Sequence, residues 1–213
     1  MRSTALLRRA GPLLLLVLLL GLLSLLVPDF MGVRNMRGLL LSVTLVGTIA
    51  ATMMLVLAMR EVDLSVGSIV ALSGVLAAVA ISATGSIALG VLAGLAGGAL
   101  VGLFNGLVVA GLKVNSLIVT LATMEVVRGL AFLVSGGESV AIPVQGFYAL
   151  GSGSFLGVNW PIWAMIASFV AFGVLLNRTV FGRNILAIGG NPEAARLAGV
   201  PITRIRIVVF TLQ

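Results

Sequence analysis

The sequence predicts an all-α protein, a polytopic bundle of transmembrane helices with six complete spans and the start of a seventh. Hydrophobic residues make up 60% of the 213 residues and charged residues only 9%, whereas a soluble domain carries about 25% charged residues. The mean hydropathy is +1.26, and the apolar residues form runs of about 20, the length that crosses a bilayer. So few polar residues cannot cover a soluble core. A soluble domain, a disordered chain and a disulfide scaffold are therefore excluded.

The residue types also exclude several kinds of chemistry. The chain contains no histidine and no cysteine, so zinc and haem ligation, thiol catalysis, a Ser-His-Asp triad and disulfides are not possible. We therefore expect no metal site, no catalytic residue and no cofactor. The net charge is +7, and in a membrane protein such an excess marks cytoplasmic loops rather than a nucleic-acid surface.

Six apolar runs are long enough to cross the bilayer. They cover residues 10–27, 38–59, 66–83, 87–112, 116–135 and 161–177. A seventh begins near Ile205 but extends only about 13 Å as a helix by Gln213, so we expect a natural parent to continue beyond it. The first run could be a signal peptide, because Arg2, Arg8 and Arg9 precede it. The lack of an A-x-A cleavage site favours a retained span instead.

The basic residues orient the bundle. With the N-terminus in the cytoplasm, Arg34 and Arg37 lie outside and Arg128 lies within a span. The basic residues on the inner side are Arg2, Arg8, Arg9, Arg60, Lys113, Arg178, Arg183, Arg196, Arg204 and Arg206. This distribution follows the positive-inside rule, and the segment 136–160, which would be outside, has no basic residue. The rings expected near the outer interface are Tyr148, Trp160 and Trp163.

The run at 87–112 carries a glycine at every fourth position. These glycines are Gly90, Gly94, Gly98, Gly102 and Gly106. Overlapping G-x-x-x-G units let another backbone approach, so we expect a helix-packing seam, with a surface that slides during gating as the alternative. Asn105 lies toward the inner end of the same helix, and we expect its amide to bond to another helix rather than to a ligand.

Two charged residues, Glu125 and Arg128, lie near the middle of the run at 116–135. Because they are three positions apart, they share a helix face and can form an ion pair. Charges at that depth usually face the bundle interior or a water-filled path. The two residues are therefore either a self-neutralised structural pair or part of a pathway or switch. Thr120 and Thr123 add hydroxyls to the same helix.

A polar break separates the second and third runs. Four polar residues, Glu61, Asp63, Ser65 and Ser68, cluster there in an otherwise apolar chain. Asp63 or Ser65 can cap the N-terminus of the helix that follows. The clustering also allows a broken helix that lines a cavity.

The basic segment 178–204 contains the start and stop signals of a complete short helix. Asn191 is the predicted N-cap, Pro192 fits the first position and Glu193 faces the positive end of the helix dipole. Arg196 lies toward the negative end, and Gly199 supplies a left-handed stop. A helix this short is not stable alone. We predict a docking element held by a partner, with a helix lying on the inner membrane surface as the alternative.

The sequence contains no nucleotide-binding P-loop. That motif places a lysine directly after a glycine, whereas Lys113, the one lysine of the chain, lies between Leu112 and Val114. If ATP drives transport, its hydrolysis takes place on another subunit.

Three stretches occur together in a known order. They are Val62-Asp63-Leu64-Ser65-Val66-Gly67-Ser68, then Leu117-Ile118-Val119-Thr120-Leu121-Ala122-Thr123-Met124 with Arg128-Gly129, then Asn177-Arg178-Thr179 through Gly182-Arg183-Asn184 to Glu193-Ala194-Ala195-Arg196-Leu197-Ala198-Gly199-Val200. In this combination the chain resembles the permease subunit of bacterial monosaccharide ABC importers, the ribose, xylose and arabinose group, with the arabinose branch the most similar. The resemblance covers about residues 27–209.

The resemblance implies a non-catalytic subunit of the bacterial inner membrane that translocates a monosaccharide, a pentose such as L-arabinose. Two permease copies would form the pathway, a cytoplasmic ATP-binding subunit would drive them, and a periplasmic binding protein would deliver the sugar. Residues 1–213 would be one permease domain with a cytoplasmic coupling loop at 178–204. The candidate coupling residues are Asn191, Pro192, Glu193, Ala194, Ala195, Arg196 and Gly199. The candidate pathway residues are Asp63, Ser65, Asn105, Thr120, Thr123, Glu125 and Arg128, of which Glu125 departs from the family pattern.

Two other classes of function stay open. A secondary, ion-coupled transporter of a small polar solute is suggested by Glu125 with Arg128, and by Phe181-Gly182-Arg183, which faintly resembles a loop of facilitator-superfamily carriers. An intramembrane enzyme would need a nucleophile, a base or a metal cluster, and the chain has few residues that could form one.

Overall fold

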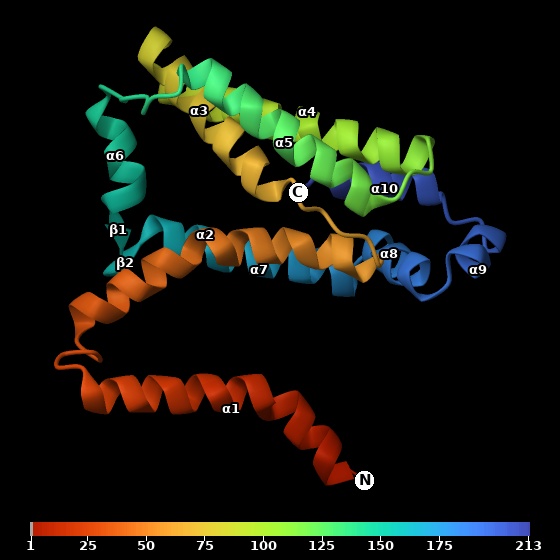
Figure 1. Cartoon of the computed structure of the whole chain (residues 1–213), viewed down its shortest axis with the longest axis horizontal. Coiled ribbons are helices and arrows are strands. Elements are labelled where there is room, and N and C mark those ends of the chain that lie inside the picture. Colours follow the sequence, from red (N-terminus) through yellow and green to blue (C-terminus); the bar gives the residue numbers. More distant parts are fainter. Residues whose placement is uncertain (1) are drawn as a thin grey trace. The chain divides into compact units, whose positions relative to one another are not determined.

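The computed structural model describes residues 2–213, with side chains described from Ala10 onward. The chain divides into two compact units, residues 1–43 and 44–213, and each is described by itself. The described chain is almost entirely helical, with a single two-stranded hairpin as its only sheet (Figure 1). The predicted all-α class is therefore confirmed.

The first unit consists of α1 (Arg2–Leu26) and the beginning of α2 (Val33–Ala58). A tight turn joins the two helices. In this turn Asp29 has a φ of 57° and accepts a backbone hydrogen bond from Gly32 at 2.8 Å. The Asn35 side chain donates to the Phe30 carbonyl at 2.6 Å and so closes the turn.

Within the described residues, five helices are long and apolar enough to cross a membrane. They are α2, α3 (Val66–Thr84), α4 (Ile87–Gly111), α5 (Ser116–Ser135) and α7 (Trp160–Arg178). Each coincides with a predicted run to within a few residues. The apolar part of α1, Ala10–Leu26, is shorter than these helices, and the predicted start of a seventh span is α10 (Ile202–Thr211). The chain is a multi-pass membrane protein.

The glycines of α4 pack against two different helices. On α3, the carbonyl oxygen of Ala77 would lie 2.8 Å from a Cβ added to Gly90, and that of Ser73 would lie 2.8 Å from a Cβ added to Gly94. A Cβ added to Gly102 would overlap the Phe210 carbonyl on α10, and one on Gly106 would lie 2.7 Å from the Cα of Ile207. The N-terminal part of the glycine stripe therefore contacts α3, with Gly98 against the Ser73 hydroxyl, and its C-terminal part, Gly102 and Gly106, contacts α10.

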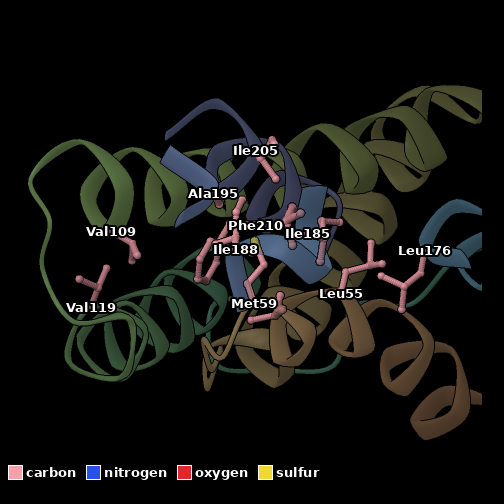
Figure 2. Packing of buried hydrophobic residues seen from close by; sticks show 12 residues of the cluster. Leu55, Met59, Val109, Val119, Leu176, Ile185, Ile188, Ala195, Ile205 and Phe210 are labelled. Carbon is pink, nitrogen blue, oxygen red and sulfur yellow. The ribbon is translucent and has the colours of Figure 1, made fainter. Parts of the chain in front are cut away.

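The main hydrophobic core lies where α2, α4, α5 and α7 meet the last three helices (Figure 2). Phe210, Ile185 and Ile188 are completely buried at its centre. The last three helices are α8 (Val180–Gly190), α9 (Pro192–Leu197) and α10. Ala195 connects α9 to this core, so the short helix is packed on one side.

The segment 178–204 contains more helical structure than the sequence predicted. The sequence predicted one short helix in a loop, whereas α8 precedes it and is capped by the Thr179 hydroxyl, which accepts from the Gly182 amide at 3.0 Å. The buried residues of α8 recur at helical spacing. Its glycines obscured the pattern: Gly182 lies against the Leu176 carbonyl and Gly189 against the Ala58 carbonyl.

The segment 136–160 also contains structure that was not predicted. It forms α6 (Gln145–Ser152) and a hairpin of β1 (Ser154–Phe155) with β2 (Val158–Asn159). The Trp160 ring stacks on Phe155 at 5.9 Å, and the Trp163 indole donates to the Phe155 carbonyl at 3.2 Å. Two of the three predicted interfacial aromatics therefore gather at the start of α7.

Candidate functional site

The polar break before α3 folds into a buried hydrogen-bonded cluster. Asp63, Ser65 and Asn105 are all completely buried. The Ser65 hydroxyl donates to Asp63 Oδ1 at 2.6 Å and accepts from Asn105 Nδ2 at 2.9 Å. The Ser65 amide donates to the same Asp63 oxygen at 2.8 Å. Three candidate pathway residues thus form one hydrogen-bonded unit that joins α4 to the break. The bonded residues Ser65 and Asn105 are 40 positions apart in the sequence.

A second set of bonds holds the backbone of the break against α5. The Thr120 hydroxyl accepts from the Leu64 amide at 3.1 Å, and the Ser116 hydroxyl accepts from the Val62 amide at 3.3 Å. Both hydroxyls are buried. Because α5 supplies acceptors for amides that no helix satisfies, the extended stretch is tolerated inside the bundle.

The predicted capping role of Ser65 is wrong in its chemistry. Ser65 does occupy the N-cap position of α3, but its side chain accepts no bond from the first turn of the helix. Its hydroxyl oxygen accepts from Asn105 Nδ2 instead, and its backbone (φ −80°, ψ −10°) is helical rather than extended as in a capping residue. Asp63 likewise binds Ser65 rather than the helix terminus.

Two oxygens of the cluster, and the buried Ser68 hydroxyl on α3, have no hydrogen-bond partner among the described residues. They are Asp63 Oδ2, Asn105 Oδ1 and Ser68 Oγ. Asp63 lies between α2 and α3, and burial raises the pKa of its carboxyl above the ordinary value, while the hydrogen bonds from Ser65 and Asn105 act in the opposite direction. The cluster therefore has unused hydrogen-bonding capacity at a place where polar groups are costly.

An ion pair joins this break to α10. Arg206 Nη2 lies 2.8 Å from Glu61 Oε1, and the two side chains are 23% and 14% exposed. The pair borders a cavity of about 620 Å³ that is also lined by Lys113 and by Glu193 and Arg196 of α9. Glu61 is two residues from Asp63, so the ion pair connects the helix that follows α9 to the buried cluster.

Helix α9 has the caps that the sequence predicted. The Asn191 side chain accepts from the amides of Glu193 and Ala194 at 3.0 and 3.1 Å. Pro192 occupies the first turn, and Gly199 has a φ of +80°. Glu193 and Arg196 form an exposed ion pair one turn apart. Of the six helical residues only Ala195 is buried, so α9 presents nearly all of its surface outward.

One exposed residue of α9 was not identified from the sequence. Leu197 is 82% exposed, although it belongs to a capped helix. Its position was readable in principle, because it lies two residues after the buried Ala195 and so points to the opposite side of the helix.

The predicted ion pair between Glu125 and Arg128 is not formed. Both side chains are exposed on α5, and among the described residues neither takes part in an ion pair such as those of Arg196 with Glu193 and Arg206 with Glu61. The two side chains also differ in their surroundings, because Arg128 lines a cavity of about 300 Å³ with Ala71 and Val75 of α3. Spacing of three positions places two residues on one side of a helix, but Glu125 lies opposite the buried residues Thr120, Thr123 and Val127.

Thr123 is separate from the polar cluster. It is buried and lines an apolar groove of about 410 Å³ between α4 and α5, together with Phe104 and Val126. Of the seven candidate pathway residues, the structure thus brings four together: Asp63, Ser65, Asn105 and Thr120.

The fold and these features define a class: a multi-pass helical membrane protein with a buried polar break and an exposed, self-capped helix. The family model described as "Branched-chain amino acid transport system / permease component" matches residues 35–213. The chain belongs to this permease family. No solved structure shows significant similarity to it.

Several curated relatives are similar over most of the chain. The L-arabinose ABC transporter permease protein AraH of Azospirillum brasilense is 58% identical over 98% of this chain and 61% of its own length. The L-arabinose transport system permease protein AraH of Escherichia coli is 52% identical over 88% of this chain and 57% of its own. The ribose import permease protein RbsC of Bacillus subtilis is 41% identical over 96% of this chain and 64% of its own length. The chain thus spans about three-fifths of the length of these relatives.

Proposed function

We propose that the chain is the permease subunit of an ATP-binding-cassette importer that carries a monosaccharide, a pentose such as L-arabinose, across the bacterial inner membrane. Membership of the permease family supports the transport role. The names of the arabinose relatives, which are 52% and 58% identical to the chain, support the sugar. The subunit itself is non-catalytic, and a partner hydrolyses the ATP.

The observation that carries the proposal is the exposed, capped helix α9. A helix of six residues does not persist without support, yet this one has a side-chain cap, a proline start and a glycine stop. It is held to the core through Ala195 while Leu197, Glu193 and Arg196 face outward. This is the arrangement expected of a rigid lever that inserts in a cleft of the ATP-binding subunit.

The path from the lever into the membrane runs through α10. Arg206 on α10 pairs with Glu61, and Glu61 leads into the cluster of Asp63, Ser65 and Asn105. Gly102 and Gly106 of α4 contact the α10 backbone, so a shift of α10 would displace α4 as well. We propose that movement of α9 reaches the polar break by this route and that the break, with Thr120, borders the sugar pathway.

Orientation and partners complete the proposal. The N-terminus and α9 are cytoplasmic, as the distribution of basic residues favours. The functional unit contains two permease copies, the ATP-binding subunit and a periplasmic sugar-binding protein. Residues 1–213 act as one permease domain, with 178–204 as the coupling segment.

Co-purification with the ATP-binding subunit tests the docking role. We expect Glu193→Arg to reduce recovery of that subunit strongly, because it breaks the exposed pair with Arg196 and reverses a charge on the docking surface. Glu138→Arg is the matched control, since Glu138 is also exposed but lies in the segment proposed to be outside. Equal recovery with both variants would refute the docking role of α9.

The comparisons favour the importer over the ion-coupled alternative. That alternative was suggested by Glu125 and Arg128 within a span and by Phe181-Gly182-Arg183, whereas the family match and the name of the arabinose relative support an importer driven by ATP. Uptake by vesicles that contain this chain alone, driven by a proton gradient without ATP, would restore the ion-coupled alternative.

A further inference from the structure

The exposed face of α5 carries charges where a lipid-facing helix carries none. Glu125 and Arg128 are the tenth and thirteenth residues of a 20-residue apolar helix, and both are exposed. Neither forms an ion pair or a hydrogen bond with the other described residues. Charges at the middle of a span are costly against lipid and normally meet a partner or water. This face of α5 is therefore covered in the working protein.

The residues around Glu125 are small enough for a close contact. Ala122 lies one turn before Glu125 and Gly129 one turn after it, and both are exposed. A Cβ added to Gly129 would have no atom within 4 Å, whereas the glycines of the α4 seam all have close neighbours. A glycine inside a helix costs about 1 kcal/mol relative to alanine, and packing among the described residues does not explain the one at 129. Small residues of this kind allow another helix to approach.

The charges select a second copy of the same chain as the occupant. Copies inserted with the same orientation are related by a two-fold axis along the membrane normal, so α5 of one copy runs parallel to α5 of the other. Glu125 and Arg128 differ in depth by about 4.5 Å, a distance that their long side chains can span. Each glutamate then reaches the arginine of the other copy, and the four charges neutralise one another.

We propose that α5 pairs with α5 of a second copy about a two-fold axis, with Glu125 of each chain bound to the partner's Arg128. This inference rests on the proposed function, which requires two permease copies, and adds the surface through which they meet. It also gives a reason for Glu125, the candidate residue that departs from the family pattern, because a pairing of this kind needs both signs of charge at one depth.

Cysteine cross-linking in membranes tests the contact. The chain contains no cysteine, so Gly129→Cys and Ala122→Cys each introduce a single thiol. Oxidation should yield disulfide-linked dimers of both variants. Val170→Cys is the matched control, because Val170 is 60% exposed near the middle of α7 and does not line the groove beside α5; it should remain monomeric. Absence of dimers at both α5 positions, or equal dimers with Val170→Cys, overturns the proposal.

Charge exchange tests the pairing itself in the Gly129→Cys background. Glu125→Arg alone, or Arg128→Glu alone, should abolish most of the cross-linking, and the double exchange should restore it. Unchanged yields in the single variants overturn the charge pairing. Modification of Gly129→Cys by a hydrophilic thiol reagent in place of dimer formation would show a water-filled surface and also overturn it.

The failure of this inference can be separated from failure of the transport proposal. If the protein is a dimer by light scattering in detergent but α5 does not cross-link, the α5 interface is refuted and the two-copy permease stands. If the chain shows neither dimers nor binding of the ATP-binding subunit, both proposals are refuted.

Discussion

Replacing Gly102 by alanine should separate α4 from α10. The added Cβ would overlap the Phe210 carbonyl and lie 3.0 Å from both the Phe210 carbonyl carbon and the Thr211 Cα. These are backbone atoms, so no side chain can turn aside and one helix must move. Overpacking of this kind costs about 1–3 kcal/mol. Because a chain of this size loses about 2–4 °C of melting temperature per kcal/mol, we expect a decrease of about 2–12 °C.

Thermal unfolding in detergent, followed by circular dichroism, measures this decrease. Gly111→Ala is the matched control: it lies at the end of the same helix, and a Cβ there has no neighbour within 4 Å. The control should unfold at or slightly above the wild-type temperature, because alanine favours the helix. A Gly102→Ala protein that is as stable as the wild type would refute the claim that the seam is closed by backbone contact.

Three further variants test the site. Asp63→Asn keeps the acceptor oxygen for Ser65 and removes the charge. Because a raised pKa makes ionisation of the folded wild type unfavourable, the stability of the variant relative to wild type should increase as the pH rises above the ordinary Asp pKa of 3.8. A difference in unfolding temperature that does not depend on pH would contradict this. Arg206→Ala should cost about 1–3 kcal/mol by leaving Glu61 half-buried and unpaired, and exchange of the two charges should recover part of it. Asn191→Ala should cost about 1 kcal/mol in α9 and speed amide hydrogen exchange there about fivefold, whereas Asn191→Ser should not.

The spans could be predicted because lipid imposes a length and a composition on each of them. The helices from α2 to α5 and α7 follow directly from apolar runs of about 20 residues. Helix α9 could be predicted for a different reason: Asn191, Pro192 and Gly199 act locally, and no long-range contact is needed to interpret them.

The contacts between elements could not be predicted. Glu61 and Arg206 are 145 positions apart, and nothing in the sequence pairs them. The Ser65 hydroxyl could have capped α3, but its oxygen accepts from Asn105, a residue 40 positions away on α4. For Glu125 and Arg128, spacing gave the side of the helix but could not say whether that side faces this chain or a partner.

The central claim is that α9 is a cytoplasmic lever for a separate motor, and labelling of Leu197→Cys tests it most directly. The side chain at this position is 82% exposed, and the native chain has no competing thiol. A membrane-impermeant maleimide should label it in inside-out vesicles and not in intact cells, and the ATP-binding subunit should protect it. Leu156→Cys, at an 80% exposed position proposed to be outside, should show the reverse. Labelling of Leu197→Cys from the exterior of intact cells would contradict the account.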